Sequence, residues 1–201
     1  MPALKIKDLS IGTLRKTNFT LQSGRITCIS GPSGSGKSRL LRAIADLESH
    51  TGDIFLGNKP QGTYPAHKWR RQVMMIPAQS AWWEDTVGEH FLTPMPAALK
   101  ALGFPEDAAR WQVNRLSSGE KQRLALIRAV SYKPQVLLLD EPTANLDADS
   151  TQMVELWLTG LIKKYQLPTI WVAHSYMQIQ RVAHLHLAIV DSQLEEQEIH
   201  L

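Results

Sequence analysis

Short apolar runs rich in β-branched residues recur along this chain, and they alternate with longer segments whose apolar residues follow a helical spacing. The apolar runs predict buried strands at residues 25–30, 52–56, 72–76, 136–140, 169–173 and 185–190. The helical spacing predicts helices over residues 40–47, 119–131 and 151–165. Strands that alternate with helices are typical of a parallel sheet covered on both faces. The predicted fold class is therefore α/β, a mostly parallel sheet flanked by helices.

Two regions depart from this alternation. Residues 4–10 and 18–22 predict a small antiparallel β edge at the N-terminus. The stretch 80–116 contains three prolines with apolar clusters between them, and it predicts short helices inserted between two strands. We therefore expect one domain over residues 1–201, with a core formed by residues 1–79 and 117–201 and a short helical subdomain between them.

The composition fits a globular protein of a reducing compartment. Hydrophobic residues make up 43% and charged residues 20% of the chain, which argues against disorder. The net charge is only +3 and no block of Lys or Arg occurs, so a dedicated nucleic-acid binder is not expected. The single cysteine, Cys28, excludes an internal disulfide and a cysteine-based zinc site. With no apolar run near the roughly 18 residues of a membrane span and no signal-peptide layout, we expect a soluble, intracellular protein.

The sharpest motif, G-x-x-x-x-G-K-S, lies between a predicted strand and a predicted helix, which is the context of a phosphate-binding loop. Gly34 and Gly36 let backbone N–H groups curl around a phosphate, and the helix start adds its positive dipole. We expect Lys37 to reach the β- and γ-phosphates and the Ser38 hydroxyl to bind Mg²⁺. The alternative, a plain glycine-rich turn, does not explain this context. The nucleotide-binding residues predicted here are Gly31, Pro32, Ser33, Gly34, Ser35, Gly36, Lys37 and Ser38.

A second candidate site stands where the apolar strand 136–140 ends in two carboxylates, Asp140 and Glu141. Parallel sheets bind ligands at the carboxyl ends of their strands, so this pair is expected to face the phosphate loop. Asp140 then suits a Mg²⁺ shell, and Glu141 suits a general base that activates water. An acidic pair that merely caps a strand is the alternative, but the presence of Lys37 favours catalysis. Together the two motifs predict a P-loop NTPase.

Between these motifs lies Leu116-Ser-Ser-Gly-Glu120, followed by a predicted helix. The phosphate loop, this pentapeptide and the sequence LLLDEP, in this order, resemble the ATP-binding cassette (ABC) ATPases, in which the pentapeptide is usually LSGGQ. The resemblance covers nearly the whole chain. It implies that Gln79 is the Q-loop glutamine, which binds nucleotide and Mg²⁺, and that Asp147 is the D-loop aspartate at the nucleotide site. It also implies that His174 is the switch histidine and contacts the γ-phosphate, whereas His174 alone would suggest only a hydrogen bond at a strand end.

The resemblance further implies a homodimer, formed on ATP binding, in which two copies enclose two nucleotides head to tail. Ser117 and Gly119 would then contact the γ-phosphate held by the opposite subunit. Taken alone, Ser117-x-x-Glu120 is a helix capping box, and this interpretation is compatible with the first in a free monomer. Ser118 replaces a glycine of the family pattern and Glu120 replaces the glutamine. We expect these two replacements to weaken the site without abolishing it.

Two further departures from the family pattern affect the nucleotide site. Phe19 is the only aromatic residue before the phosphate loop, so the adenine-stacking aromatic residue of the N-terminal sheet is missing. Ile11 or Leu14 is expected to supply an apolar contact instead. Arg39 follows the phosphate loop where the family commonly has Thr, and it adds a charge beside the phosphates. Without a stacking ring, we expect little selectivity between ATP and GTP.

Two residue pairs outside these motifs have candidate roles. Trp82 and Trp83 follow Gln79, where the family's ATPases form the groove that receives a helix of the membrane subunit. Adjacent side chains diverge on a helix and on a strand, so at least one indole should be partly exposed; the alternative is that both pack into the helical subdomain. His184-x-His186 has the spacing of a metal pair, but without a nearby Cys or Asp a structural or exposed role is favoured.

The predicted function is ATP hydrolysis, with Glu141, His174 and Lys37 as catalytic residues, that powers transport through a separate membrane permease subunit. ATP and Mg²⁺ are the expected cofactors, and the expected location is cytoplasmic, peripheral on the inner face of the cell membrane. No nucleic-acid partner is expected. The alternative is an ABC ATPase that acts on nucleic acid or ribosomes. A P-loop kinase would lack the LSSGE motif, and a binding module without turnover would lack Glu141.

Overall fold

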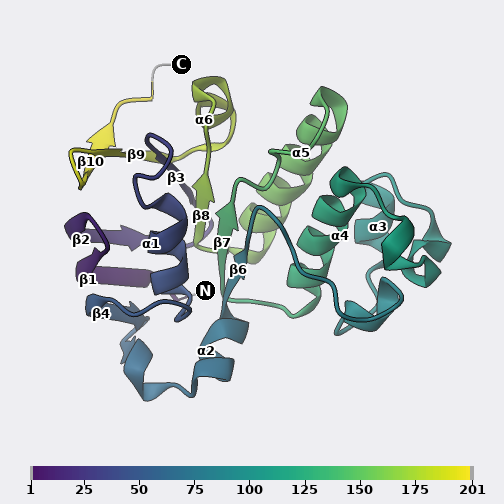
Figure 1. Cartoon of the computed structure of the whole chain (residues 1–201), viewed down its shortest axis with the longest axis horizontal. Helices are drawn as coiled ribbons and strands as arrows, with labels where there is room; N and C mark the ends of the chain where they lie inside the picture. Colours follow the sequence, from purple (N-terminus) through teal and green to yellow (C-terminus); the bar gives the residue numbers. More distant parts are fainter. Residues whose placement is uncertain (1, 200–201) are drawn as a thin grey trace.

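The computed structural model describes residues 2–199 of the chain, and its centre is a six-stranded sheet in the order β10-β9-β3-β8-β7-β6 (Figure 1). Its strands are β3 (Ile26–Ser30), β6 (Val73–Ile76), β7 (Val136–Asp140), β8 (Thr169–Val172), β9 (Leu185–Val190) and β10 (Gln193–Gln197). All neighbouring strands run parallel except β10, which pairs antiparallel with β9. The mostly parallel α/β sheet expected from the sequence is confirmed, and β10 is an addition to it.

A second, antiparallel sheet has the order β2-β1-β4-β5. Its strands are β1 (Leu4–Ile11), β2 (Leu14–Leu21), β4 (Thr51–Leu56) and β5 (Lys59–Pro60). The predicted N-terminal edge is therefore present, but β2 begins at Leu14 rather than at residue 18. Ile11 pairs directly with Leu14 across a two-residue turn, in which Gly12 has a φ of +57°. The sequence analysis missed the start of β2 because two consecutive charged residues, Arg15 and Lys16, interrupt the alternation of apolar and polar positions there.

Helices cover both faces of the main sheet. On the face toward the antiparallel sheet lies α1 (Lys37–Ile44), whereas α4 (Ser118–Ser131) and α5 (Ala148–Tyr165) lie together on the other side (Figure 1). The short helices α2 (Ala66–Gln72) and α6 (Tyr176–Val182) were not predicted, because each has only seven residues, too few to show a clear helical period. Within residues 2–199 no helix is both long enough and apolar enough to cross a bilayer.

The alternation of side chains along β7 divides the interior into two apolar clusters. Leu137 and Leu139 pack with α4 and α5, and Val136 and Leu138 pack with α1 and the antiparallel sheet. Every residue of β7 is buried, which explains why the strand has no polar position before Asp140. The two clusters hold the carboxyl end of β7 from both faces.

The segment 80–116 contains α3 (Pro96–Ala101) and three short 3₁₀ helices, at Gly88–His90, Glu106–Arg110 and Val113–Arg115. Leu102 and Phe104 belong to the same apolar cluster as α4 and α5, so the segment packs continuously with the core on that face. Its separation as a subdomain stays a prediction.

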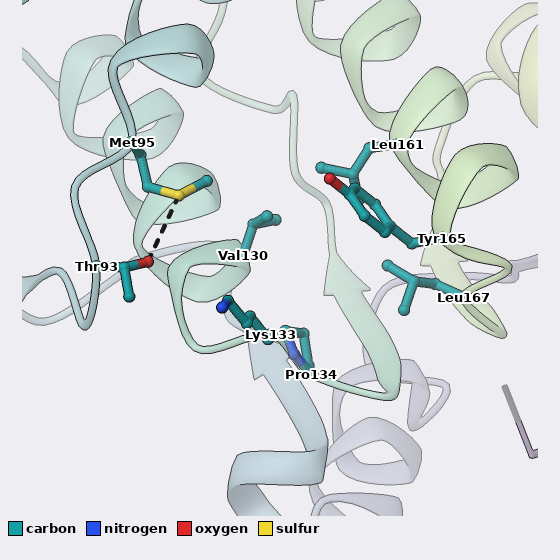
Figure 2. Close-up of a pocket in the computed structure, with 8 residues that line it drawn as sticks. All are labelled: Thr93, Met95, Val130, Lys133, Pro134, Leu161, Tyr165 and Leu167. Atoms are coloured by element: carbon teal, nitrogen blue, oxygen red, sulfur yellow. Dashed lines mark hydrogen bonds between the residues drawn. The ribbon is translucent and has the colours of Figure 1, made fainter.

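An apolar cavity of about 310 Å³ lies between the C-terminal ends of α4 and α5 (Figure 2). Pro134 and Leu167 in its wall come just before β7 and β8, so the cavity is at the amino ends of these strands. The predicted site residues follow the carboxyl ends, and none of them lines this cavity. Its lining residues are Thr93, Met95, Val130, Lys133, Pro134, Leu161, Tyr165 and Leu167.

The environment of Cys28 predicts an unreactive thiol. Cys28 lies on β3 with no exposed surface, and burial, reinforced by the charge of Glu155, raises its pKa to about 12. Only the thiolate attacks disulfide reagents, so the folded protein should not react with Ellman's reagent at pH 8. One thiol per chain should appear in guanidinium chloride. Full labelling of the native protein within minutes would contradict this burial.

Candidate functional site

The parallel register brings four predicted segments to one edge of the main sheet. Ile29 on β3 and Asp140 on β7 both pair with Val172 on β8, and Ile76 on β6 pairs with Leu139. The neighbouring strands β3, β8, β7 and β6 therefore end at the same edge. The segments that follow them are the phosphate loop, His174, Asp140–Glu141 and Gln79, in this spatial order.

The loop 31–38 has the backbone that a phosphate cradle needs. Gly34 and Gly36 have φ values of +78° and +104°, a region that side-chain-bearing residues rarely adopt. A Cβ added at either position would meet no protein atom within 4 Å, so the protein leaves this side of the loop open. Helix α1 begins immediately at Lys37 rather than at residue 40, and its first N–H groups point into the loop.

Lys37 places its charge inside this loop. Its side chain is buried, and Nζ donates hydrogen bonds to the carbonyl oxygens of Gly31 at 2.8 Å and Pro32 at 3.0 Å. In residues 2–199 no carboxylate lies within ion-pair distance of Nζ. The ammonium group, which has a third N–H to donate, is therefore available to an anion bound at the loop.

Asp140 and Ser38 present oxygen ligands next to the loop. Burial raises the pKa of Asp140, and the charge of Glu141 adds to this, whereas a hydrogen bond from Ser38 and the charges of Lys37 and His174 act against it. The Oδ1 atom of Asp140 is buried without a hydrogen-bond partner. A hard divalent cation such as Mg²⁺ fits an unpaired carboxylate oxygen beside a hydroxyl. Gln79 is exposed at the same edge, and no hydrogen bond within the described chain joins it to these two residues.

Glu141 and His174 form the polar end of the site. Glu141 has a φ of +51°, an uncommon conformation for a residue with a side chain, which turns the chain sharply at the end of β7. Its Oε1 is in contact with Nε2 of His174, which follows the neighbouring strand β8. Both side chains remain partly exposed. They line a cavity of about 220 Å³ together with Thr143, Ala144, Thr151, Val172, Ser175, Gln178 and Arg181.

A buried polar network that the sequence analysis missed supports the wall of this cavity. Glu155 on α5 accepts two hydrogen bonds from Arg181, at 2.8 and 2.9 Å, and one from Gln178 at 2.8 Å. Gln178 also donates to Thr143 Oγ1 at 2.8 Å, two residues after Glu141. The sequence does contain a signal for this network. Glu155 precedes the apolar residues Leu158 and Ile162 by three and seven positions, so all three lie on the same buried face of α5.

The signature pentapeptide begins α4 as a capping box. Ser117 Oγ accepts a hydrogen bond from the backbone N–H of Glu120, and the Glu120 carboxylate accepts one from the N–H of Ser117. A Cβ on Gly119 would lie 3.3 Å from the Leu146 side chain, so this helix start packs against the chain that enters α5. No hydrogen bond in the described residues joins the pentapeptide to the phosphate loop of the same chain.

Asp147 is the N-cap of α5 in this structure. Its carboxylate accepts hydrogen bonds from the backbone N–H and the hydroxyl of Ser150, at 2.8 and 2.9 Å, and these bonds lower its pKa. Leu146, which contacts the start of α4, immediately precedes it. Asp147 therefore lies close to the pentapeptide and on an exposed surface.

Arg39, the residue that directly follows the phosphate loop, contacts Glu48 and the β1–β2 turn in this structure. Its Nε and one Nη donate to Glu48 Oε1 at 2.7 and 2.6 Å, and its guanidinium lies against Gly12 in the β1–β2 turn. Ile11 and Leu14, the expected apolar contacts of the base, are buried and present almost no surface.

His184 and His186 have separate structural contacts. His184 Nδ1 accepts a hydrogen bond from the backbone N–H of Ile26, and burial, followed by the charge of Arg25, lowers its pKa. His186 is buried, its Nε2 hydrogen-bonds Ser30 Oγ at 2.8 Å, and burial lowers its pKa. These contacts support the structural interpretation rather than a shared metal.

Trp82 and Trp83 diverge as expected. Trp83 is 64% exposed, whereas Trp82 packs partly into the core. The buried His90 lies edge-on to both indole rings, and the guanidinium of Arg128 on α4 lies over both at 4.6 and 5.0 Å. Trp83 also lines a groove of about 180 Å³ between β6 and α4.

Comparison with known proteins agrees with this geometry. The family model described as ABC transporter matches residues 14–144. The chain is 32% identical over 179 residues to the probable iron export ATP-binding protein FetA of Escherichia coli, covering 83% of this chain and 80% of that protein. It is 31% identical over 186 residues to the ABC transporter ATP-binding protein YxdL of Bacillus subtilis, covering 83% and 72%.

A solved structure of a bacterial Atm1-family ABC exporter with ATP bound has the same fold. The TM-score is 0.86 at 23% sequence identity, over 98% of this chain and 39% of the exporter chain. The chain therefore belongs to the ABC transporter family, and it has the fold of an ABC ATPase domain. It is an ATP-binding cassette with ATPase activity that serves transport, and the comparisons give no support to a role on nucleic acid or ribosomes.

The network around Glu155 generates a stability prediction. Arg181→Ala removes two of the hydrogen bonds that the buried Glu155 carboxylate accepts, and since Arg181 is half-exposed we expect a loss of about 1–2 kcal/mol in the free energy of unfolding at pH 7. Burial acts to raise the pKa of Glu155, but the hydrogen bonds from Arg181 and Gln178 outweigh it and lower the pKa.

A carboxyl with a lowered folded-state pKa stabilises the protein above its ordinary pKa of 4.5, and this contribution is lost as the pH falls through the folded-state value. The difference between the parent and Arg181→Ala should therefore shrink below pH 4.5 in urea titrations. Arg42→Ala, which removes an exposed contact of 3.5 Å to Glu48, is the matched control and should change stability by less than about 0.5 kcal/mol. An Arg181→Ala difference that is independent of pH would contradict the assignment.

Proposed function

We propose that two copies of this chain bind two ATP molecules with Mg²⁺ head to tail, hydrolyse them, and thereby drive transport through a separate membrane subunit. The observation that carries the proposal is the convergence of Lys37, Asp140, Glu141 and His174 at one edge of the main sheet. Catalysis in such a site depends on positioning and electrostatics rather than on covalent chemistry.

Each residue of the edge has a separate task in this proposal. The loop 31–38 and Lys37 bind the β- and γ-phosphates through backbone N–H groups and the ammonium group. Ser38 and Asp140 hold Mg²⁺, with Gln79 approaching from the end of β6. When bound, Mg²⁺ supplies charge neutralisation for the phosphate oxygens.

Glu141 is the general base of the proposed reaction. Its carboxylate orients the attacking water and accepts a proton from it, while the sharp turn at Glu141 fixes the direction of the side chain. His174 contacts this carboxylate in the free chain, and its half-exposed ring can exchange that contact for one with the γ-phosphate. The network of Gln178 and Thr143 supports the segment that carries Glu141.

The second copy supplies the other wall of each nucleotide site. In the capping box the Ser117 oxygen accepts a hydrogen bond, so its O–H remains able to donate to a phosphate oxygen. The pentapeptide is not joined to the phosphate loop of its own chain, which supports contact with the loop of a partner. Gly119 allows the close approach, and Asp147 lies next to this surface.

The membrane subunit is proposed to select the cargo and to hold the cassette at the inner face of the membrane. Relatives of similar identity carry names for iron export, sulfate/thiosulfate import and phosphate import, which supports selection outside the cassette. The exposed Trp83 and its groove beside β6 are the proposed docking point of the membrane subunit. An indole beside a groove is a frequent interface anchor.

The proposed base is tested by Glu141→Gln. Removing the base while retaining Lys37 and Ser38 should lower the rate of ATP hydrolysis by about 100-fold or more and leave ATP binding intact. The variant should form an ATP-dependent dimer on size-exclusion chromatography. Glu195→Gln, which changes an exposed carboxylate on β10, is the control and should hydrolyse ATP like the parent. Hydrolysis by Glu141→Gln at the parent rate would exclude Glu141 as the base.

The docking role is tested by Trp83→Ala. In the assembled transporter this variant should lose co-purification with the membrane subunit or coupling to transport, because it removes the exposed anchor. Its own ATPase activity and thermal stability should stay near the parent values, since Trp83 contributes little to the core. Tyr165→Ala, another exposed aromatic residue at the opposite end of the strands, is the control. Unaltered assembly and transport in Trp83→Ala would place the interface elsewhere.

A further inference from the structure

The sheet order gives the direction in which a bound nucleotide extends. In the proposed function the γ-phosphate lies beside Glu141 and His174, which follow β7 and β8. The phosphate loop follows β3, the next strand in the order β7-β8-β3-β9. A nucleoside triphosphate that runs from β7 across the loop therefore carries its base toward β9 and the antiparallel sheet. The backbone N–H of Arg15 donates to the carbonyl of Ser192 at 2.8 Å, which places the start of β2 beside the β9–β10 turn.

The N-terminal segment on this side of the molecule, residues 2–30, offers no exposed aromatic surface to a base. Phe19 is the single aromatic residue in residues 2–30, and it packs against the apolar cluster of the antiparallel sheet. Ile11 is 4% exposed and Leu14 is 1% exposed, so neither can cover a base. A binding surface for the base therefore has to come from another kind of side chain or from a residue outside this segment.

Arg39 is a planar group held in this place. A Cβ on Gly12 would lie 2.1 Å from Arg39 Nη1, so the guanidinium occupies the space that a side chain at position 12 would fill. Glu48 fixes the guanidinium through contacts of 2.7 Å to Nε and 2.6 Å to the other Nη. The side chain is nevertheless 52% exposed, and it belongs to the residue that directly follows the phosphate loop.

We propose that the guanidinium of Arg39 is the platform on which the base of the bound nucleotide stacks. A guanidinium is planar, weakly hydrated and attracted to the faces of π-systems. Stacking contacts the face of a base and makes no hydrogen bonds to its edge, so adenine and guanine stack on this guanidinium equally well. The absence of a side chain at Gly12 and the bond to Glu48 are the two features that keep the guanidinium beside the β1–β2 turn. The inference rests on the proposed function and adds to it the residue that holds the base.

The experiment compares ligands that share the triphosphate but differ in the base. Dissociation constants of ATP, GTP and inorganic tripolyphosphate, each with Mg²⁺, are measured by calorimetry for the parent and for Arg39→Ala. Loss of stacking should weaken ATP and GTP by roughly tenfold each, and tripolyphosphate by less than about twofold. Arg42→Ala, which loses a neighbouring contact to the same Glu48, is the matched control and should bind all three ligands like the parent.

Two further variants test the geometry. Arg39→Lys keeps the charge and loses the plane, so it should weaken both nucleotides and leave tripolyphosphate unchanged. Gly12→Ala should displace the guanidinium and give the same pattern, with thermal unfolding used to confirm that the hairpin remains folded. Recovery of full nucleotide affinity by Arg39→Lys would show that charge alone matters and would overturn the stacking role.

The outcomes for the inference and for the proposed function are distinguishable. An equal loss for tripolyphosphate in Arg39→Ala would assign Arg39 to the phosphates, and unchanged binding of all ligands would remove it from the site. Either result overturns the stacking platform while the parent still binds ATP. A parent chain that binds neither ATP nor tripolyphosphate would instead overturn the proposed function, and the inference with it.

Discussion

The parallel pairing of β3, β8, β7 and β6 is the constraint on which the candidate site depends. A parallel register makes all four strands end at one edge, so residues that are distant in sequence become neighbours. The pairing of Asp140 with Val172 sets the Glu141–His174 contact, and the burial of β7 on both faces keeps this register from slipping. A shift by one residue would turn Asp140 into an apolar cluster.

The two apolar clusters give the two faces of the sheet different roles. The cluster around α1 and the antiparallel sheet supports the phosphate loop and the start of α1. The cluster around α4, α5 and the segment 80–116 supports the pentapeptide and the loop that carries Trp82 and Trp83. The phosphate loop and the pentapeptide thus rest on opposite faces of one sheet, and both depend on the strands that the two clusters share.

Most of the architecture and the motif residues could be predicted from the sequence because they rest on local patterns. The loop at Lys37 and the strand ending in Asp140 are contiguous signals, and the register of a parallel sheet then brings them together. The network of Glu155 with Arg181 could not be predicted, because its two ends lie on different helices. The direction of Arg39 depends on Glu48 and on an absent side chain at Gly12, and no local pattern shows either contact.

Helix α4 joins two exposed surfaces of the cassette into one mechanical element. Ser117 caps its N-terminus, and ten residues into the helix Arg128 donates a hydrogen bond of 2.7 Å to the carbonyl of Ala81 while lying over Trp82 and Trp83. Ser117 and Arg128 are eleven residues apart, so at 1.5 Å per residue they are separated by about 16 Å along a single helix. The contacts of Arg128 thus tie residues 81–83 to the same helix whose first turn carries the pentapeptide.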